Sequence, residues 1–252
     1  MGSMIKYFLY IIFTLNVGVF NLFAIEYKAS EILDSMIISL SPFSSKGIME
    51  QEIIRSNKII NRSTFEYYSQ KYGSDIMIKY ISPESILGNA FLSINNGADI
   101  WVYFSKLNRS RKIVDHTKFE KVLGGDFTYL DLSGKGQWRD DYRIKKINSG
   151  EKKHYLLLLI PRSKLDPECD SLKVYINKRS YYPNRVLYYK NNIKYKTLRF
   201  NELSEVQNVN TSMLLNMKNH LDSSETNIRI IDITYNITFD KYFFSKNNII
   251  SN

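Results

Sequence analysis

The sequence has few of the residues that most directly reveal a protein's chemistry. Its 252 residues include a single cysteine, Cys169. One cysteine cannot form an internal disulfide, and it has no second thiol with which to build a zinc site. It lies within the segment DPECDS at 166–171, so it is not a lipid-attachment cysteine directly after an export leader. No glycine follows Gly150, so we expect asparagine and aspartate to form the later turns, as at Asn191 and Asn192.

Recognisable catalytic motifs are also missing. The three histidines lie far apart, at 116, 154 and 220, and the chain has neither a G-x-S-x-G nucleophile elbow nor a phosphate-binding loop. Four acidic residues could pair as catalytic carboxylates, but acidic residues in a loop are commonly caps and turn formers. These are Asp126, Asp131, Asp140 and Asp141. We therefore expect a protein that is not an enzyme and that binds no cofactor or metal.

The composition favours one packed β domain. Hydrophobic residues make up 44% of the chain and charged residues 24%, which is typical of a globular protein. Tyrosine (19) and phenylalanine (14) are abundant, and both favour strands. About 228 residues remain once an export leader is set aside, enough for one large β domain over 25–252.

The positive charge allows two interpretations. The formal net charge is +10, and the leader contributes only Lys6. The charge could attract anionic lipid head groups or nucleic acid, or it could be an ordinary solvated surface. The basic residues look scattered, and the short runs NRSRK at 108–112 and RIKK at 143–146 do not form a nucleic-acid motif. We therefore expect a solvated surface and no nucleic-acid partner.

An export leader is predicted at the N-terminus. An uncharged stretch at 7–24 follows Lys6, is rich in Phe, Leu and Ile, and ends in Leu-Phe-Ala before Ile25. A basic head, an apolar middle and a small residue at the cut are typical of a signal peptide, so we expect cleavage near Ala24 and a periplasmic protein. The alternative is an uncleaved anchor, because a spanning helix needs ~20 residues.

The remaining sequence predicts one helix and then a series of strands. Residues 26–40 carry apolar side chains at helical spacing, and Pro42 ends the pattern. Short runs rich in Ile, Val, Tyr and Phe follow, separated by Gly, Asn or Pro. The expected strands lie at 47–56, 59–72, 75–82, 86–94, 99–105, 142–148, 152–161, 172–179, 184–190, 193–200, 211–218, 228–237 and 242–245.

Residues 118–141 interrupt the strands with a glycine-containing, partly helical loop. A long antiparallel sheet with one or two covering helices must curl. We therefore expect a mainly β protein with a single curved sheet that forms an incomplete barrel, covered by the N-terminal helix and the mid-chain loop. Periodicity alone does not distinguish a filled core from a cavity for acyl chains.

Two blocks of sequence resemble the outer-membrane lipoprotein-sorting (LolA-like) family. The first runs from 78 to 104 (IKYISPESILGNAFLSINNGADIWVYF) and contains a Pro-acidic-Ser-Ile-Leu turn, an Asn-Gly turn and a Trp-x-Tyr strand. The second, GGDFTYLDL at 124–132, is similar to a segment of the broader sorting-protein group, and RKI at 111–113 resembles the family's basic strand. Ser105 and Lys106 stand where the family often has proline, and Gly125 replaces a serine.

The resemblance implies a LolA/LolB-like half-barrel whose apolar interior accepts the acyl chains of lipoproteins. It implies a monomer that receives lipoproteins from an inner-membrane ABC transporter and passes them to an outer-membrane acceptor. The expected cavity residues are Ile76, Ile78, Tyr80, Leu87, Phe91, Trp101 and Tyr103. The expected lid residues are Gly124, Gly125, Asp126, Phe127, Tyr129 and Lys71, with Lys71 near the position of a basic residue that holds the family's cavity closed.

Three alternatives remain open on the sequence. A lipid- or lipoprotein-binding sensor could use the same half-barrel. A secreted hydrolase could use His154 or the acidic residues at 126–141. An envelope protein could keep the leader as an anchor.

Overall fold

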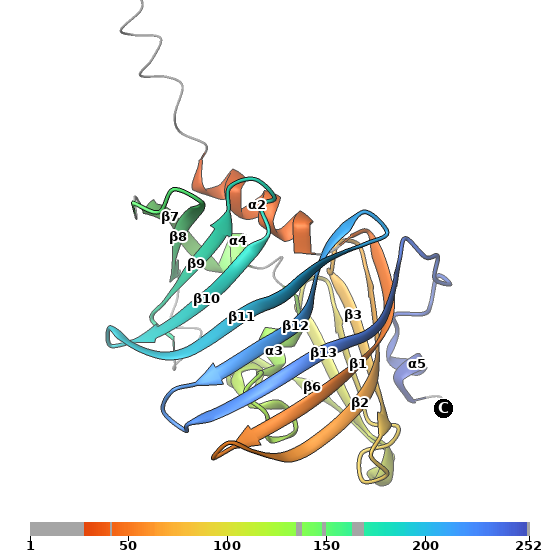
Figure 1. Cartoon of the computed structure of the whole chain (residues 1–252). Helices are drawn as coiled ribbons and strands as arrows, with labels where there is room; N and C mark the ends of the chain where they lie inside the picture. The colour runs from red at the N-terminus through yellow and green to blue at the C-terminus, as the bar shows by residue number, and fades with distance from the viewer. Residues whose placement is uncertain (1–27, 41, 135–137, 148–149, 163–168, 251–252) are drawn as a thin grey trace, which may run out of the picture.

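The computed structural model describes residues 28–40, 42–134, 138–147, 150–162 and 169–250. Within these residues the dominant element is one antiparallel sheet of 13 strands. The sheet is strongly curved and does not close on itself, which confirms the predicted mainly β, incomplete-barrel fold (Figure 1). The predicted leader at 1–24 and its cleavage site lie outside the described residues.

The strand order explains how the chain builds this sheet. It runs β6-β5-β4-β3-β2-β1-β13-β12-β11-β10-β9-β8-β7, so the first and last strands pair with each other in the middle. The first six strands are β1 (Ser44–Arg55), β2 (Lys58–Gln70), β3 (Asp75–Ser82), β4 (Ala90–Ile94), β5 (Asp99–Phe104) and β6 (Arg109–Ile113). The other seven are β7 (Tyr142–Ile147), β8 (His154–Pro161), β9 (Ser171–Asn177), β10 (Pro183–Lys190), β11 (Ile193–Val206), β12 (Val209–Asn219) and β13 (Ser224–Tyr235).

The turns follow the predicted chemistry. Asn191 and Asn192 both have positive φ between β10 and β11, as do Asn95 and Asn96 between β4 and β5. Asparagine tolerates the left-handed conformation better than most residues do, so it can replace glycine in these tight reversals. The absence of glycine after residue 150 therefore does not prevent a meander.

The concave face of the sheet is covered by two segments. Helix α2 (Ala29–Leu40) buries Ile32, Leu33 and Met36 there, as the helical spacing predicts. The described residues between β6 and β7, 114–134 and 138–141, also pack there, and we call them the plug. The plug contains η2 (Asp115–Phe119), η3 (Val122–Gly124), α3 (Tyr129–Leu132) and α4 (Trp138–Asp141), and a further short helix, η1 (Ser105–Leu107), joins β5 to β6.

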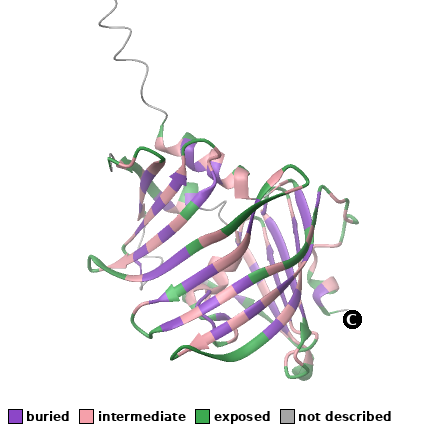
Figure 2. Cartoon of the chain, viewed as in Figure 1, coloured by how far each residue is buried: buried purple, intermediate pink, exposed green. Residues whose placement is uncertain are grey.

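The convex face is covered over only part of its area. The strand predicted at 242–245 is wrong, because these residues form turns and bends before helix α5 (Lys246–Ile250). Phe243 and Phe244 pack with Ile249 against the outer side of β3 to β5. Burial alternates along many strands (Figure 2). On β4, four consecutive residues are buried, so both of its faces are covered.

Candidate functional site

A cavity of about 200 Å³ lies between the concave face of the sheet, α2 and the plug. Its wall is mainly apolar and includes Ile37, Leu40, Met49, Phe65, Leu198 and Ile230. Hydroxyl groups in the wall satisfy one another: the Oγ atoms of Ser45 and Ser69 are 3.0 Å apart, and Thr211 Oγ1 is 2.7 Å from the Tyr235 hydroxyl. An apolar ligand could therefore occupy the cavity without leaving these groups unpaired.

Four of the predicted cavity residues belong to the core on this face. Ile76 and Ile78 of β3 line the cavity directly. Tyr80 points to the same side, with its ring centroid 5.4 Å from that of Phe65. Phe91 of β4 stacks on Tyr129 of the plug, with 6.2 Å between centroids, so the predicted lid residue Tyr129 contacts a predicted cavity residue.

The other three predicted cavity residues lie elsewhere. Trp101 and Tyr103 point to the convex face, where they pack in the outer cluster beneath α5. Leu87 is 45% exposed in the turn before β4, which begins at residue 90 instead of 86. The prediction is wrong for Trp101 and Tyr103 because the inward positions of β5 are those of Ile100 and Val102, and a shift of one residue reverses every side chain of a strand.

The sequence analysis also missed most of the cavity wall. Besides α2, β1 and β2, the wall includes Leu198 of β11, Leu215 of β12, and Ile228 and Ile230 of β13. The i, i+2 spacing of Ile228 and Ile230 indicates a half-buried strand. The local sequence does not show that β13 pairs with β1, whose paired residues lie 169 to 190 positions away, and so faces the same cavity.

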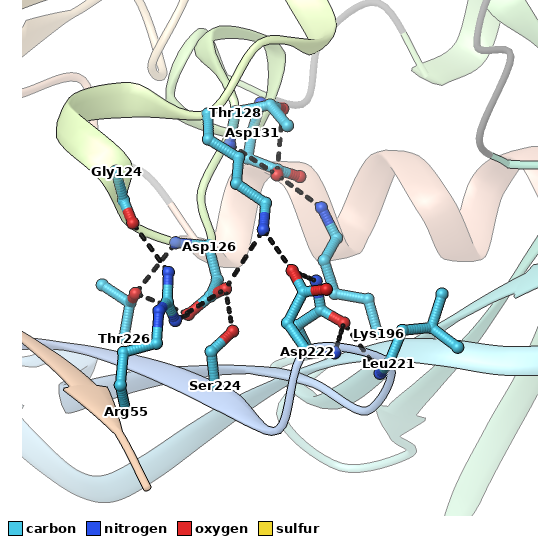
Figure 3. A network of polar contacts seen from close by, with 12 residues as sticks. Arg55, Gly124, Asp126, Thr128, Asp131, Lys196, Leu221, Asp222, Ser224 and Thr226 are labelled. Carbon is cyan, nitrogen blue, oxygen red and sulfur yellow. Dashed lines mark hydrogen bonds and ion pairs between the residues drawn. The ribbon is translucent and has the colours of Figure 1, made fainter. Parts of the chain in front are cut away.

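The plug is anchored to the sheet by Asp126, whose side chain is fully buried. Ser224 Oγ donates to its carboxylate at 2.5 Å and Thr226 Oγ1 donates at 2.8 Å, while the Asp126 amide donates to Thr226 Oγ1 at 2.9 Å. Arg55 and Lys121 place cationic groups at 3.4 and 3.9 Å from the same carboxylate (Figure 3). Residues of β1 and β13 therefore hold this plug residue, and Lys121 adds a second cation from the plug itself.

Two glycines, Gly124 and Gly125, lie where the plug closely approaches the sheet. Gly124 has φ +75°, and its carbonyl accepts a hydrogen bond from Arg55 Nη2 at 2.8 Å. A Cβ on Gly125 would lie 3.3 Å from Thr226 Oγ1, so a side chain here would require its neighbours to shift by a few tenths of an ångström. Phe127 is buried and lines the cavity. The predicted lid residues 124–127 thus form the part of the plug that contacts the sheet and the cavity.

Lys71 does not contribute to this closure. It lies in the turn between β2 and β3, where its Nζ is 2.8 Å from Asp75. Burial alone would raise the pKa of Asp75, but hydrogen bonds from Lys71, the Asn95 amide and Gln70 lower it below its usual value. Arg55 at the end of β1 contacts the plug where Lys71 does not, so the prediction for Lys71 is wrong.

A second anchor ties α3 to β10 and β11. Asp131 caps α3 by accepting hydrogen bonds from Thr128, and Lys196 Nζ lies 2.8 Å from its carboxylate. The Tyr188 hydroxyl donates to the other carboxylate oxygen at 3.1 Å. Burial, reinforced by the negative charge of Asp131, holds the pKa of Tyr188 well above its usual value, so this phenol stays a donor. Asp126 and Asp131 therefore have structural partners in place of the catalytic pairing considered above.

A second pocket, of about 260 Å³, lies next to this anchor. Asp131 lines both pockets, and the second also includes Trp138, Tyr142, Tyr195 and Asp222. Its charged groups are already engaged, because Lys196 contacts Asp131 and Lys121 contacts Asp222 at 2.5 Å. The apolar cavity is therefore the better candidate for a ligand.

The histidines and Cys169 make local contacts. His154 Nδ1 lies 3.0 Å from Glu151, and His220 Nε2 lies 2.9 Å from Thr197 Oγ1. Burial and three neighbouring cations lower the pKa of His220. The Cys169 thiol is buried and donates to the Ser171 carbonyl at 3.5 Å. Among the described residues, no group of three or more His, Cys, Asp or Glu side chains is placed to hold a metal.

Comparison with known proteins relates this geometry to other structures. A family model described as an uncharacterized protein matches residues 73–251, which is more than half of the chain. No curated protein matches the sequence significantly. In the part of the chain that the structure describes, no helix is long and apolar enough to span a membrane.

Three solved structures share the fold over nearly their whole length. A domain from Vibrio parahaemolyticus, titled a putative outer membrane lipoprotein-sorting protein, has TM-score 0.79 and 22% identity and covers 89% of this chain and 100% of its own. A DUF1329 family protein from Desulfovibrio piger has TM-score 0.76, 19% identity and coverage of 88% and 97%. A LolA superfamily protein from Nitrosomonas europaea has TM-score 0.70, 16% identity and coverage of 88% and 99%.

Proposed function

Because the chain belongs to a family of uncharacterized proteins and has the LolA-like fold, we propose that it is a periplasmic carrier that binds the acyl chains of lipoproteins. The observation that carries this proposal is the apolar cavity between the sheet, α2 and the plug. Each buried methylene contributes about 0.8 kcal/mol, so an acyl chain needs such a shelter to cross water. In this proposal the carrier is a monomer that loads at an inner-membrane ABC transporter and unloads at an outer-membrane acceptor.

The size of the cavity bears on the mechanism. Its volume of about 200 Å³ is smaller than the ~300–1,000 Å³ of ordinary ligand pockets. An acyl chain would enter only if α2 or the plug moved. A moving plug would break polar contacts, among them Arg55 to Gly124, the bonds to Asp126 from β13 and those to Asp131 from β10 and β11. It would also expose apolar side chains such as Phe127. In this proposal the plug opens reversibly to load and release an acyl chain.

Two adjacent isoleucines on β13 offer a matched test. Ile230 lines the cavity, whereas Ile231 is 57% exposed beside the β-bulge. Ile230→Trp fills the cavity, while Ile231→Trp adds the same bulk outside it. With a synthetic lipopeptide carrying two palmitoyl chains, native mass spectrometry should detect a one-to-one complex for the wild type. We expect Ile230→Trp to weaken binding at least about tenfold, because the indole ring occupies space that the acyl chain would otherwise fill with packed contacts. A tenfold loss corresponds to ~1.4 kcal/mol of binding free energy.

The control variant Ile231→Trp should bind as the wild type does. Equal binding by wild type and Ile230→Trp would place the lipopeptide elsewhere and contradict the proposal. The proposal would also be contradicted if the wild-type protein neither bound the lipopeptide nor took up a lipoprotein from membranes.

A further inference from the structure

The net positive charge is concentrated in one part of the chain. Residues 142–199 contain 15 Lys and Arg and four Asp and Glu, a net charge of +11, whereas the whole chain has +10. The other 194 residues therefore carry a net charge of −1. The basic residues are thus not scattered in the fold, because residues 142–199 form the adjacent strands β7 to β10 and the first half of β11.

Strand alternation sends five of these basic side chains to the convex face. The concave side is taken by core residues such as Tyr142, Leu172, Val174, Val186 and Leu198. The positions between them point outward, and these hold Arg143, Lys145, Lys173, Arg185 and Arg199. No Asp or Glu occurs in β7 to β10 or in β11 up to residue 199; Glu151 and Asp170 lie outside the strands, and residues 166 and 168 lie outside the described residues. We call these five residues and their outward neighbours the basic face.

Apolar and aromatic side chains alternate with the charges on the basic face. The register places Lys145, Leu158, Lys173 and Leu187 in one row across four strands. The next row contains Leu156, Tyr175, Arg185 and Arg199. The Arg185 guanidinium lies 4.0 Å from the centre of the Tyr175 ring, and Lys173 Nζ lies 4.8 Å from that of Tyr189. Leu158, Leu187, Tyr175 and Tyr189 all remain partly exposed.

On the basic face, Arg185 Nη2 lies 3.5 Å from Glu151. Ion pairs are more numerous on the rest of the convex face. On β2, Arg62 lies 3.7 Å from Glu50 and 2.5 Å from Glu52, and on β13, Arg229 lies 2.5 Å from Glu202. The outer side of β4 and β5 is covered by the C-terminal residues around α5. The basic face is therefore distinguished by both its charge and its exposure. In Figure 1 its strands β7 to β10 form the part of the sheet farthest from α5.

We propose that the basic face docks the protein onto the anionic surface of a lipid bilayer. Lys and Arg there would pair with acidic head groups, each contributing about fivefold to binding. The tyrosines and leucines between them fit the boundary between head groups and acyl chains, where amphipathic side chains are stable. Five strands spaced by about 4.8 Å give the face a width of ~19 Å, enough to contact several head groups. The basic face is separate from the cavity, so this inference does not depend on the proposed cargo.

Charge-matched triple variants test the docking. The first carries Arg143→Glu, Lys145→Glu and Arg199→Glu, all at exposed positions of the basic face. The control carries Lys58→Glu, Lys106→Glu and Arg109→Glu, which are exposed in the other half of the sheet, β1 to β6, and change the net charge equally. Binding is measured by sedimentation with vesicles of phosphatidylcholine containing three-tenths phosphatidylglycerol, and with pure phosphatidylcholine as the baseline.

We expect the wild type and the control triple to bind the anionic vesicles and the basic-face triple to lose on the order of a hundredfold. Wild-type binding should also fall as salt is raised, a measurement that needs no variant. Equal loss in both triples would assign the effect to net charge alone and overturn the proposal. The proposal would also be overturned if the wild type did not bind the anionic vesicles, or bound pure phosphatidylcholine equally well. It would be overturned as well if the basic face bound only an acidic protein or a nucleic acid. The vesicle assay contains no lipopeptide, so a failure of the protein to bind vesicles is distinguishable from a failure to bind the proposed cargo.

Discussion

At the scale of single residues, Asp126 is the most constrained group in the proposed site. A carboxylate with no solvent exposure accepts hydrogen bonds from two hydroxyl groups and lies near two cations. Removing one member of a buried polar network leaves its partners unsatisfied, which costs more than the contact itself contributed. Asp126 therefore connects the stability of the fold to the position of the plug.

We expect Asp126→Asn to lower the free energy of unfolding by about 2 kcal/mol, because the charge that Arg55 and Lys121 face is lost while the side-chain volume is kept. Urea unfolding followed by circular dichroism measures the change. Asp222→Asn is the matched control, since Asp222 also pairs with Lys121 but its side chain is 49% exposed, and such pairs contribute little. A loss in Asp222→Asn as large as that in Asp126→Asn would contradict the anchoring role.

At the scale of elements, the two faces of the sheet are covered by different means. On the concave side, α2 is held by buried apolar side chains, and the plug combines buried side chains such as Phe127 with polar anchors at Asp126 and Asp131. On the convex side, the C-terminal segment is held by apolar contacts, with Phe239, Phe243 and Phe244 packed edge to face or stacked on one another. The plug therefore differs from the other two covers in having buried charged anchors.

The C-terminal helix α5 should contribute to stability through one side chain. Ile249 is 2% exposed in the outer cluster, and its neighbour Ile250 is 37% exposed. We expect Ile249→Ala to cost about 2–4 kcal/mol because it leaves a cavity against β4, and Ile250→Ala to cost less than about 1 kcal/mol. Urea midpoints at a constant m-value provide the comparison. If the two variants were equally stable, α5 would not be docked as described.

At the scale of the whole molecule, the topology separates two halves of the sheet. Strands β1 to β6 form one half and β7 to β13 the other; they join at the β1–β13 pair, and the plug crosses the concave side between the two outer edges. Core residues from both halves meet under the plug. A ligand in the cavity would therefore contact both halves and the plug at once, which should stabilise the closed molecule.

We expect the dipalmitoyl lipopeptide to raise the melting temperature of the wild type. At a concentration a hundred times the dissociation constant, the linkage amounts to ~2.7 kcal/mol, or about 5–10 °C for a domain of this size. Differential scanning calorimetry with and without the lipopeptide measures the shift. Ile230→Trp should show a much smaller one, whereas a shift of the same size in that variant would argue against the cavity as the site.

The sequence by itself determined most strands, most turns and the position of the plug. Period-2 apolar patterns specify strands such as β9 locally, and asparagine pairs such as Asn191 and Asn192 permit tight reversals without glycine. The second sequence block, residues 124–132, contains the two aspartates that anchor the plug. These features depend on neighbours in the chain, so they are visible without the fold.

Only the tertiary structure decided which face of a strand meets the cavity and which residues gather from distant strands. Trp101 and Tyr103 look like cavity residues in sequence, but the C-terminal segment buries the outer face and β5 turns them toward it. Arg55 meets Gly124 and Asp126 across 69 and 71 residues of chain. The basic face likewise emerges only when strand pairing brings residues 142–199 side by side. Side-chain direction and long-range pairing depend on the register of the whole sheet, and no local pattern contains that information.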